Sequence, residues 1–159
     1  NLYCEAMLKA LPMHKGEQGG TEGGLELLTE HWKSKGINTD GVRLQDGSGL
    51  SEANRVTTLF MAQLLAKMAA SGGTSFEAFY ESIPVAGRSG SMKNRLKGTV
   101  AEGRLRAKSG TLESVRGLAG YARTAGGELL AYALIANDYT GSGGQMRQKL
   151  EQFLVRLCR

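Results

Sequence analysis

The chain has 159 residues, 41% of them hydrophobic, and a formal net charge of +5, which suits one domain with a single hydrophobic core. It contains no apolar run of about 18 residues, so a membrane-spanning helix is excluded. His14 and His31 have no Cys, Asp or His at ligand spacing, and we expect neither a metal site nor a cofactor.

The positive charge is concentrated in the segment from Arg88 to Arg123. This segment holds nine Lys and Arg against two Glu, so it carries a charge of +7 while the rest of the chain carries −2. Such a segment could attract nucleic acid, an acidic surface or a small anionic substrate. No aromatic residue lies between Arg88 and Val115, which argues against single-stranded nucleic acid as the partner.

The first residues, NLYCEAMLKAL, predict a helix with Cys4, Leu8 and Leu11 on one side. Because Asn1 is not Met and no capping segment precedes this helix, we expect the chain to be part of a longer protein. Cys4 and Cys158 each lie on an apolar helix face, which favours two unpaired, buried thiols over a disulfide.

The next part of the chain predicts two helices and a turn. Pro12 to Gly24 is polar and rich in glycine, which predicts a loop, and helical spacing of apolar residues follows from Leu25 to Lys35. Asp46-Gly47-Ser48-Gly49 predicts a tight turn in which the Asp side chain accepts hydrogen bonds from backbone amides. A helix is expected from about Thr57 to Ala70.

A short helix and a basic segment come next. Thr74 and Glu77 have the spacing of a capping box, which predicts that the helix starts there, and Ile83 before Pro84 predicts its end. The segment from Gly87 to Arg104 holds several of the basic residues among glycines. We interpret it as a surface loop at the mouth of a cleft.

Three consecutive strands are predicted between Arg104 and Asn137. The apolar segments Val115 to Tyr121 and Leu129 to Ile135 are joined by a connection short enough to force an antiparallel hairpin. The strand before them carries residues suited to binding a substrate carboxylate: the charge of Lys108, the hydroxyls of Ser109 and Thr111, and room at Gly110. The alternative is an edge strand whose lysine discourages aggregation.

The chain closes with a predicted helix whose apolar stripe should lie on one face of the sheet. The stripe is formed by Met146, Leu150, Phe153, Leu154 and Leu157. Helices before and after an antiparallel sheet predict an α+β fold, layered α/β/α, with the sheet flanked by helices.

Three motifs together resemble a known family. DGSGLS before a helix, AG-x-x-G-S-x-x-x-R-x-K-G-T, and AKSGTL opening a hairpin with GLAGY are similar to the S13-type D-alanyl-D-alanine carboxypeptidases, the class C low-molecular-mass penicillin-binding proteins. The resemblance covers residues 1–159 as the later part of the penicillin-binding domain. It implies an incomplete penicillin-recognising serine transpeptidase/β-lactamase-like fold.

The family has active-site motifs SxxK, SxN and KTG, and two of them have counterparts here. Lys108-Ser109-Gly110 resembles KTG, with Ser in place of Thr, and Asn1 corresponds to the Asn of SxN. The resemblance implies catalytic roles for Asn1 and Lys108, with Ser109, Gly110 and Thr111 binding the substrate. No SxxK occurs in the chain. The nucleophilic serine and an adjoining part of the sheet are therefore expected in a missing amino-terminal portion.

The implied activity is that of a serine carboxypeptidase or endopeptidase on peptidoglycan peptides ending in D-Ala-D-Ala, which works through an acyl-enzyme. β-Lactams are the implied inhibitors, and we do not expect nucleic acid to be a partner. The implied location is periplasmic or otherwise extracytoplasmic. Three alternatives remain open: a non-catalytic module that binds a peptide carboxylate, a β-lactamase-like serine acyltransferase, and a nucleic-acid-binding fragment that uses the basic segment.

Overall fold

The computed structural model describes residues 1–159. The chain splits into two compact units, Asn1–Phe60 and Met61–Arg159, which we call the first and second units. No helix in the chain has both the length and the apolar character needed to span a bilayer.

The first unit packs helix α1 (Leu2–Ala10) against α2 (Thr21–Ser34), with the short 3₁₀ helix η1 (Pro12–Lys15) between them. The loop predicted from Pro12 to Gly24 is therefore wrong at both ends. Gly24 is a buried residue of α2, and a Cβ there would collide with the carbonyl oxygen of Leu8 on α1. The glycine allows two helices to approach closely, and it does not mark a loop here.

The Asp46 turn of the first unit forms as predicted. The Asp46 carboxylate accepts hydrogen bonds from the backbone N–H of Gly49 at 2.7 Å and of Ser51 at 2.6 Å, and from the side-chain amide of Asn54 at 2.9 Å. Burial raises the pKa of the Asp46 carboxyl, but these hydrogen bonds outweigh it and lower the pKa overall. The turn therefore keeps its carboxylate ionised.

Helix α3 (Thr58–Ser71) crosses the boundary between the two units at Phe60, and α4 (Gly73–Ser82) follows it in the second unit. Helix α3 starts within a residue of its predicted position and is capped by Thr57, whose hydroxyl accepts from the Phe60 N–H at 3.0 Å. Helix α4 ends before Pro84 as predicted, but the capping box is wrong. The helix starts one residue before Thr74, so no threonine stands at its N-cap position.

The sheet has the predicted three strands, β1 (Leu105–Leu112), β2 (Val115–Arg123) and β3 (Leu129–Asn137), in the order β1-β2-β3 and all antiparallel. The two-residue connection from β1 to β2 has Ser114 at φ +54°. The connection from β2 to β3 closes with the Thr124 N–H donating to the Glu128 carbonyl at 2.9 Å.

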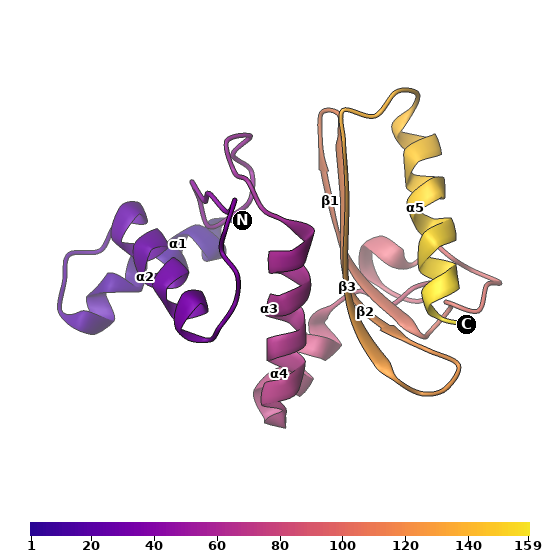
Figure 1. Cartoon of the computed structure of the whole chain (residues 1–159), viewed down its shortest axis with the longest axis horizontal. Helices are drawn as coiled ribbons and strands as arrows, with labels where there is room; N and C mark the ends of the chain where they lie inside the picture. Colours follow the sequence, from indigo (N-terminus) through magenta and orange to yellow (C-terminus); the bar gives the residue numbers. More distant parts are fainter. The chain divides into compact units, whose positions relative to one another are not determined.

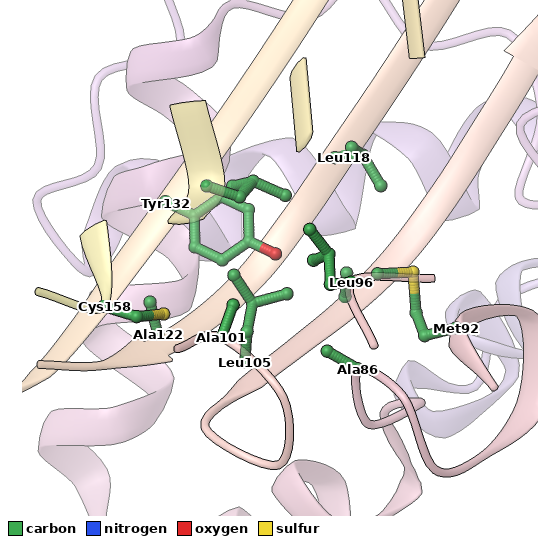
Figure 2. Packing of buried hydrophobic residues seen from close by; sticks show 11 residues of the cluster. Ala86, Met92, Leu96, Ala101, Leu105, Leu118, Ala122, Tyr132 and Cys158 are labelled. Atoms are coloured by element: carbon green, nitrogen blue, oxygen red, sulfur yellow. The ribbon is translucent and has the colours of Figure 1, made fainter. Parts of the chain in front are cut away.

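Helices cover both faces of this sheet, as Figure 1 shows for α5 (Gly143–Leu157) on one side and for α4 and most of α3 on the other. On the α5 face, Leu118, Ala122 and Tyr132 join the main cluster of buried side chains (Figure 2), together with Leu154 of α5. On the opposite face, Tyr121 packs with Leu65 of α3 and Ile83. The α/β/α layering of the second unit is thus confirmed. Alternate side chains of β2 point to opposite faces of the sheet, so this strand contributes to both cores.

The basic segment between α4 and β1 is largely exposed, as expected of a surface loop, but a few of its residues are packed in the core. It contains the short 3₁₀ helix η2 (Gly90–Met92), and Met92, Leu96 and Ala101 are all buried in the main cluster (Figure 2). Its lysines remain exposed. The few apolar residues of the segment thus cover an edge of the core. The sequence did not indicate this packing, because polar residues surround them.

The last helix, α5, is fixed by a capping box between Ser142 and Gln145. Leu154 is fully buried against the sheet, but Phe153, which we placed on the same stripe, is 49% exposed. Both cysteines are free thiols, as the sequence favoured. Cys158 is buried, whereas Cys4 is exposed, so burial of Cys4 was wrong. The backbone of Gly47 packs on the Cys4 carbonyl.

Candidate active site

The candidate site lies on the half of β1 that extends beyond the core. Leu105 and Ala107 are fully buried and anchor the strand in the main cluster. From Lys108 onward the strand becomes exposed or half-buried, because it extends beyond the packed side chains of the core. The same strand therefore has one half that is fixed by packing and another half that can meet a ligand.

The four predicted residues do not lie on one face. In the register of the sheet, Ser109 is opposite Leu118 and Thr111 is opposite Arg116, on the face that α5 covers. Lys108 is opposite Ala119, which belongs to the cluster on the other face. The row of Lys108, Ser109 and Thr111 expected from the sequence is thus divided between two faces of the strand.

A groove of about 280 Å³ lies on the α5 face of the second unit. Ser109, Gly110 and Thr111 line it from β1, but Lys108 does not. The opposite wall comes from Gly143 and Gly144 at the start of α5. Three of the four predicted second-unit residues are therefore brought together in one concave site.

Neither the backbone conformation nor the packing of the chain requires glycine at residue 110. Its φ is not in the left-handed region, and a Cβ added there would meet no atom within 4 Å. The room at this residue opens onto the outside of the molecule, so a ligand that approaches the β1 backbone would find it free.

Three arginines line the same groove: Arg95, Arg116 and Arg147. Arg95 and Arg147 share the carboxylate of Glu151, with N–O distances of 2.6 Å and 3.9 Å. The Arg116 guanidinium donates to two backbone carbonyls, those of Leu112 at 3.1 Å and Val115 at 3.0 Å, and lies over the Tyr139 ring, 5.9 Å from its centroid. The groove therefore keeps a positive charge that no carboxylate of the chain neutralises.

Lys108 is exposed, and its ammonium donates to the carbonyl of its neighbour Ser109 at 2.8 Å. A single exposed hydrogen bond of this kind holds a lysine only weakly. The ammonium can therefore turn toward another partner at little cost.

Asn1 lies in the first unit, at the N-cap position of α1. Its backbone carbonyl accepts from the Glu5 N–H at 3.1 Å, but its side-chain amide makes no capping hydrogen bond. Asn is one of the best capping residues, so this amide keeps donors and an acceptor for another partner.

Arg116 is the residue that sequence reasoning missed, since it was counted only as one of nine basic residues. The sequence did contain a pattern that could have identified it. With a two-residue connection after Leu112, antiparallel pairing places Arg116 opposite Thr111 and on the same face of the sheet. The chain has no group of three His, Cys, Asp or Glu side chains that could hold a metal ion.

Residues 1–157 match the profile of the "D-Ala-D-Ala carboxypeptidase 3 (S13) family". The chain is 35% identical over 146 residues to a D-alanyl-D-alanine carboxypeptidase of Actinomadura sp. (strain R39), covering 89% of this chain and 27% of that protein. It is 32% identical over 147 residues to "Carboxypeptidase DacB" of Mycolicibacterium smegmatis, covering 90% of this chain and 32% of that protein.

Among solved structures, the fold is similar to penicillin binding protein 4 (dacB) from Haemophilus influenzae in complex with a β-lactam. The TM-score is 0.83 at 28% identity, over 99% of this chain and 37% of the other. The penicillin-recognising fold is thereby confirmed. The chain spans about a third of the length of the relatives that it matches.

Proposed function

Because the chain belongs to the D-Ala-D-Ala carboxypeptidase 3 (S13) family, we propose that the full protein is a serine-type D-Ala-D-Ala carboxypeptidase or endopeptidase. Its substrates would be peptidoglycan peptides that end in D-Ala-D-Ala, and its inhibitors β-lactams. The observation that supports this best is the groove in which Ser109, Gly110 and Thr111 of the KTG-like strand meet uncompensated positive charge. That is a site for an anion.

The reaction would be acyl transfer through a serine ester. The serine hydroxyl attacks the carbonyl carbon of the penultimate D-Ala, the C–N bond to the last D-Ala breaks, and the departing amine takes up a proton. Water then hydrolyses the ester. The chain has no SxxK, so the serine and its lysine would come from another part of the protein.

Each site residue of the chain has a proposed role. Asn1 would bind the substrate amide, and Lys108 would raise the positive potential next to the nucleophile. The hydroxyls of Ser109 and Thr111 would bind the terminal carboxylate. The Thr111 N–H would be one oxyanion donor, and the loss of such a donor costs about 100- to 1000-fold in rate.

We also propose that residues 1–159 are a part of one penicillin-binding domain that the remainder of the protein completes. Strand β3 is the last strand of the sheet, and its outer edge has no strand partner. On α1, Leu2 and Tyr3 are largely exposed. An unpaired edge and exposed apolar side chains are both costly when left in water, and upstream chain would cover them. The substrate would place the protein outside the cytoplasm.

The test is the release of D-Ala from a short acylated peptide that ends in D-Ala-D-Ala, measured with the full-length protein. We expect turnover of this peptide and none of its L-Ala-L-Ala counterpart. Ser109→Ala should lower kcat/KM about 10- to 100-fold, because a hydrogen bond to a charged group is lost. Ser109→Thr, which keeps the hydroxyl, is the control and should retain activity. Binding of the peptide without turnover would contradict the proposal and favour a non-catalytic binding module.

A further inference from the structure

We propose that Arg116 is the principal cation that recognises the substrate carboxylate in the groove, and that Lys108 is not. This inference rests on the proposed function, and it divides the two cationic tasks of the site between two residues. Arg116 would bind the carboxylate together with Ser109 and Thr111, while Lys108 would act on the other side of the strand.

The first argument is the face of the sheet on which each cation lies. Thr111 and Arg116 are cross-strand partners, so their Cβ atoms are about 5 Å apart and their side chains leave the same face. Ser109 is two residues away on that face. Lys108 leaves the opposite face. A carboxylate that accepts from both hydroxyls therefore meets the guanidinium before it meets the ammonium.

The second argument is that Arg116 has no carboxylate partner, its guanidinium lying only over the Tyr139 ring, 5.9 Å from the ring centroid, and against backbone groups. The other two arginines of the groove share Glu151, whereas Arg116 takes part in neither ion pair of the chain. Its Nη1 donates hydrogen bonds to the carbonyls of Leu112 and Val115, and these bonds fix the position of the side chain. Nε and Nη2 make no hydrogen bond within the chain and can serve a carboxylate as a two-pronged donor.

The third argument is the position of the guanidinium beside the first residue of α5. A Cβ at residue 143 would collide with Nη2 of Arg116, so Gly143 leaves the space that the guanidinium occupies. A cation near the amino end of a helix is opposed by the helix dipole and gains no stability there. An anion bound beside both the guanidinium and the amino end of α5 would satisfy both, which explains an arrangement that internal stability alone disfavours.

Half-burial strengthens the expected interaction. Arg116 is half-buried in the groove, whereas Lys108 is exposed. Charges that are shielded from water interact more strongly than exposed ones, and salt screens them less. The site should therefore require a free carboxylate on its ligand and should discriminate strongly against an amide or an ester at that position.

The experiment compares acylation of the full-length protein by benzylpenicillin, which has a free carboxylate, and by its methyl ester. In both reactions the serine oxygen bonds to the β-lactam carbonyl carbon, the ring C–N bond breaks and the ring nitrogen takes a proton. Arg116→Gln should slow acylation by the acid about 10- to 100-fold and leave the rate with the ester nearly unchanged. Arg116→Lys should fall between Arg116→Gln and the wild type.

Arg123→Gln is the matched control, because Arg123 lies on the same strand, is exposed and leaves the opposite face. It should react as the wild type does. Arg116→Met, which keeps the length of the apolar stem, is a second neutral variant in case Arg116→Gln fails to fold. An equal loss with acid and ester would assign Arg116 a structural role in the β1–β2 turn and overturn the inference, as would an unchanged acid rate. A wild-type protein that neither ligand acylates would overturn the proposed function itself.

Discussion

The two units of the chain are stabilised in different ways. The second unit buries apolar side chains on both faces of a sheet, among them Leu105, Tyr121 and Leu154. The first unit buries few large side chains and depends on close backbone contacts at glycines and on the Asp46 turn. The candidate strand thus extends from the unit with its own core, while Asn1 belongs to the unit held by local polar and backbone contacts.

The largest effect should come from removing a core side chain of the second unit. Leu154→Ala should lower the free energy of unfolding by about 2 to 5 kcal/mol, because a fully buried side chain leaves a cavity. Urea denaturation of the full chain measures this loss. The neighbouring Phe153→Ala is the control and should cost clearly less, since Phe153 is 49% exposed. Equal losses would contradict a core on the α5 face.

A smaller effect is expected from one added methyl group in the first unit. Gly24→Ala should destabilise by about 1 to 3 kcal/mol, because its Cβ would collide with the backbone of Leu8. Gly144→Ala in α5 should instead stabilise by up to about 1 kcal/mol, since its Cβ would meet no atom closer than 3.7 Å. Thermal unfolding measures the change in stability of each variant. Changes of the same sign in both variants would contradict this prediction.

The next effect concerns a single buried hydrogen bond of the second unit. The Tyr121 hydroxyl donates to the Leu65 carbonyl at 2.7 Å, so Tyr121→Phe should cost about 0.5 to 1.5 kcal/mol. Tyr3→Phe is the control, because Tyr3 is 83% exposed. Denaturant titration at neutral pH separates them, and an equal cost in both variants would show that the hydroxyl does not anchor α3 to the sheet.

Tyr121 should also make the stability of the protein depend on pH in the alkaline range. Burial, with a smaller contribution from Tyr80, raises the pKa of Tyr121 to about 12. Its stabilising contribution should be complete below pH 10 and lost as the pH rises toward 12, because only the unfolded chain ionises easily in that range. Stability curves of wild type and Tyr121→Phe should therefore converge above pH 10. Parallel curves would contradict the burial of the phenol.

The smallest effect should be the acid sensitivity of the first unit. The pKa of the Asp46 carboxyl is lowered from 3.8, so its contribution is present above that pH and is lost as the pH falls below it. Hydrogen exchange of the Gly49 and Ser51 amides should accelerate below pH 3.8 relative to exchange in the neighbouring helices. Asp46→Asn should remove this dependence. A carboxyl that titrates at its ordinary pKa would contradict the hydrogen bonds to Asp46.

Local patterns in the sequence predicted the elements that depend on local chemistry. The hairpin of β2 and β3, the Asp46 turn and the end of α4 before Pro84 follow from alternation, side-chain hydrogen bonding and proline geometry. Features that depend on tertiary contact were missed. Gly24 was interpreted as part of a loop because only the approach of Leu8 explains it.

For the candidate site, the sequence predicted the strand and three of the residues that line the groove. The prediction of one row of residues misplaced Lys108, because adjacent residues of a strand leave opposite faces. Sequence reasoning missed Arg116, whose meaning depends on its register with Thr111 and on the absence of a carboxylate partner. Register follows from the hairpin, but the distribution of carboxylates requires the folded structure.

The central proposal is that the chain supplies the substrate-binding strand of a serine carboxypeptidase whose nucleophile lies elsewhere in the protein. Intact-mass spectrometry after exposure to penicillin tests it most directly, on the full-length protein and on residues 1–159 alone. The account predicts a mass increase of one penicillin on the full-length protein and none on residues 1–159. No increase on the full-length protein, or a covalent adduct on residues 1–159, would contradict it.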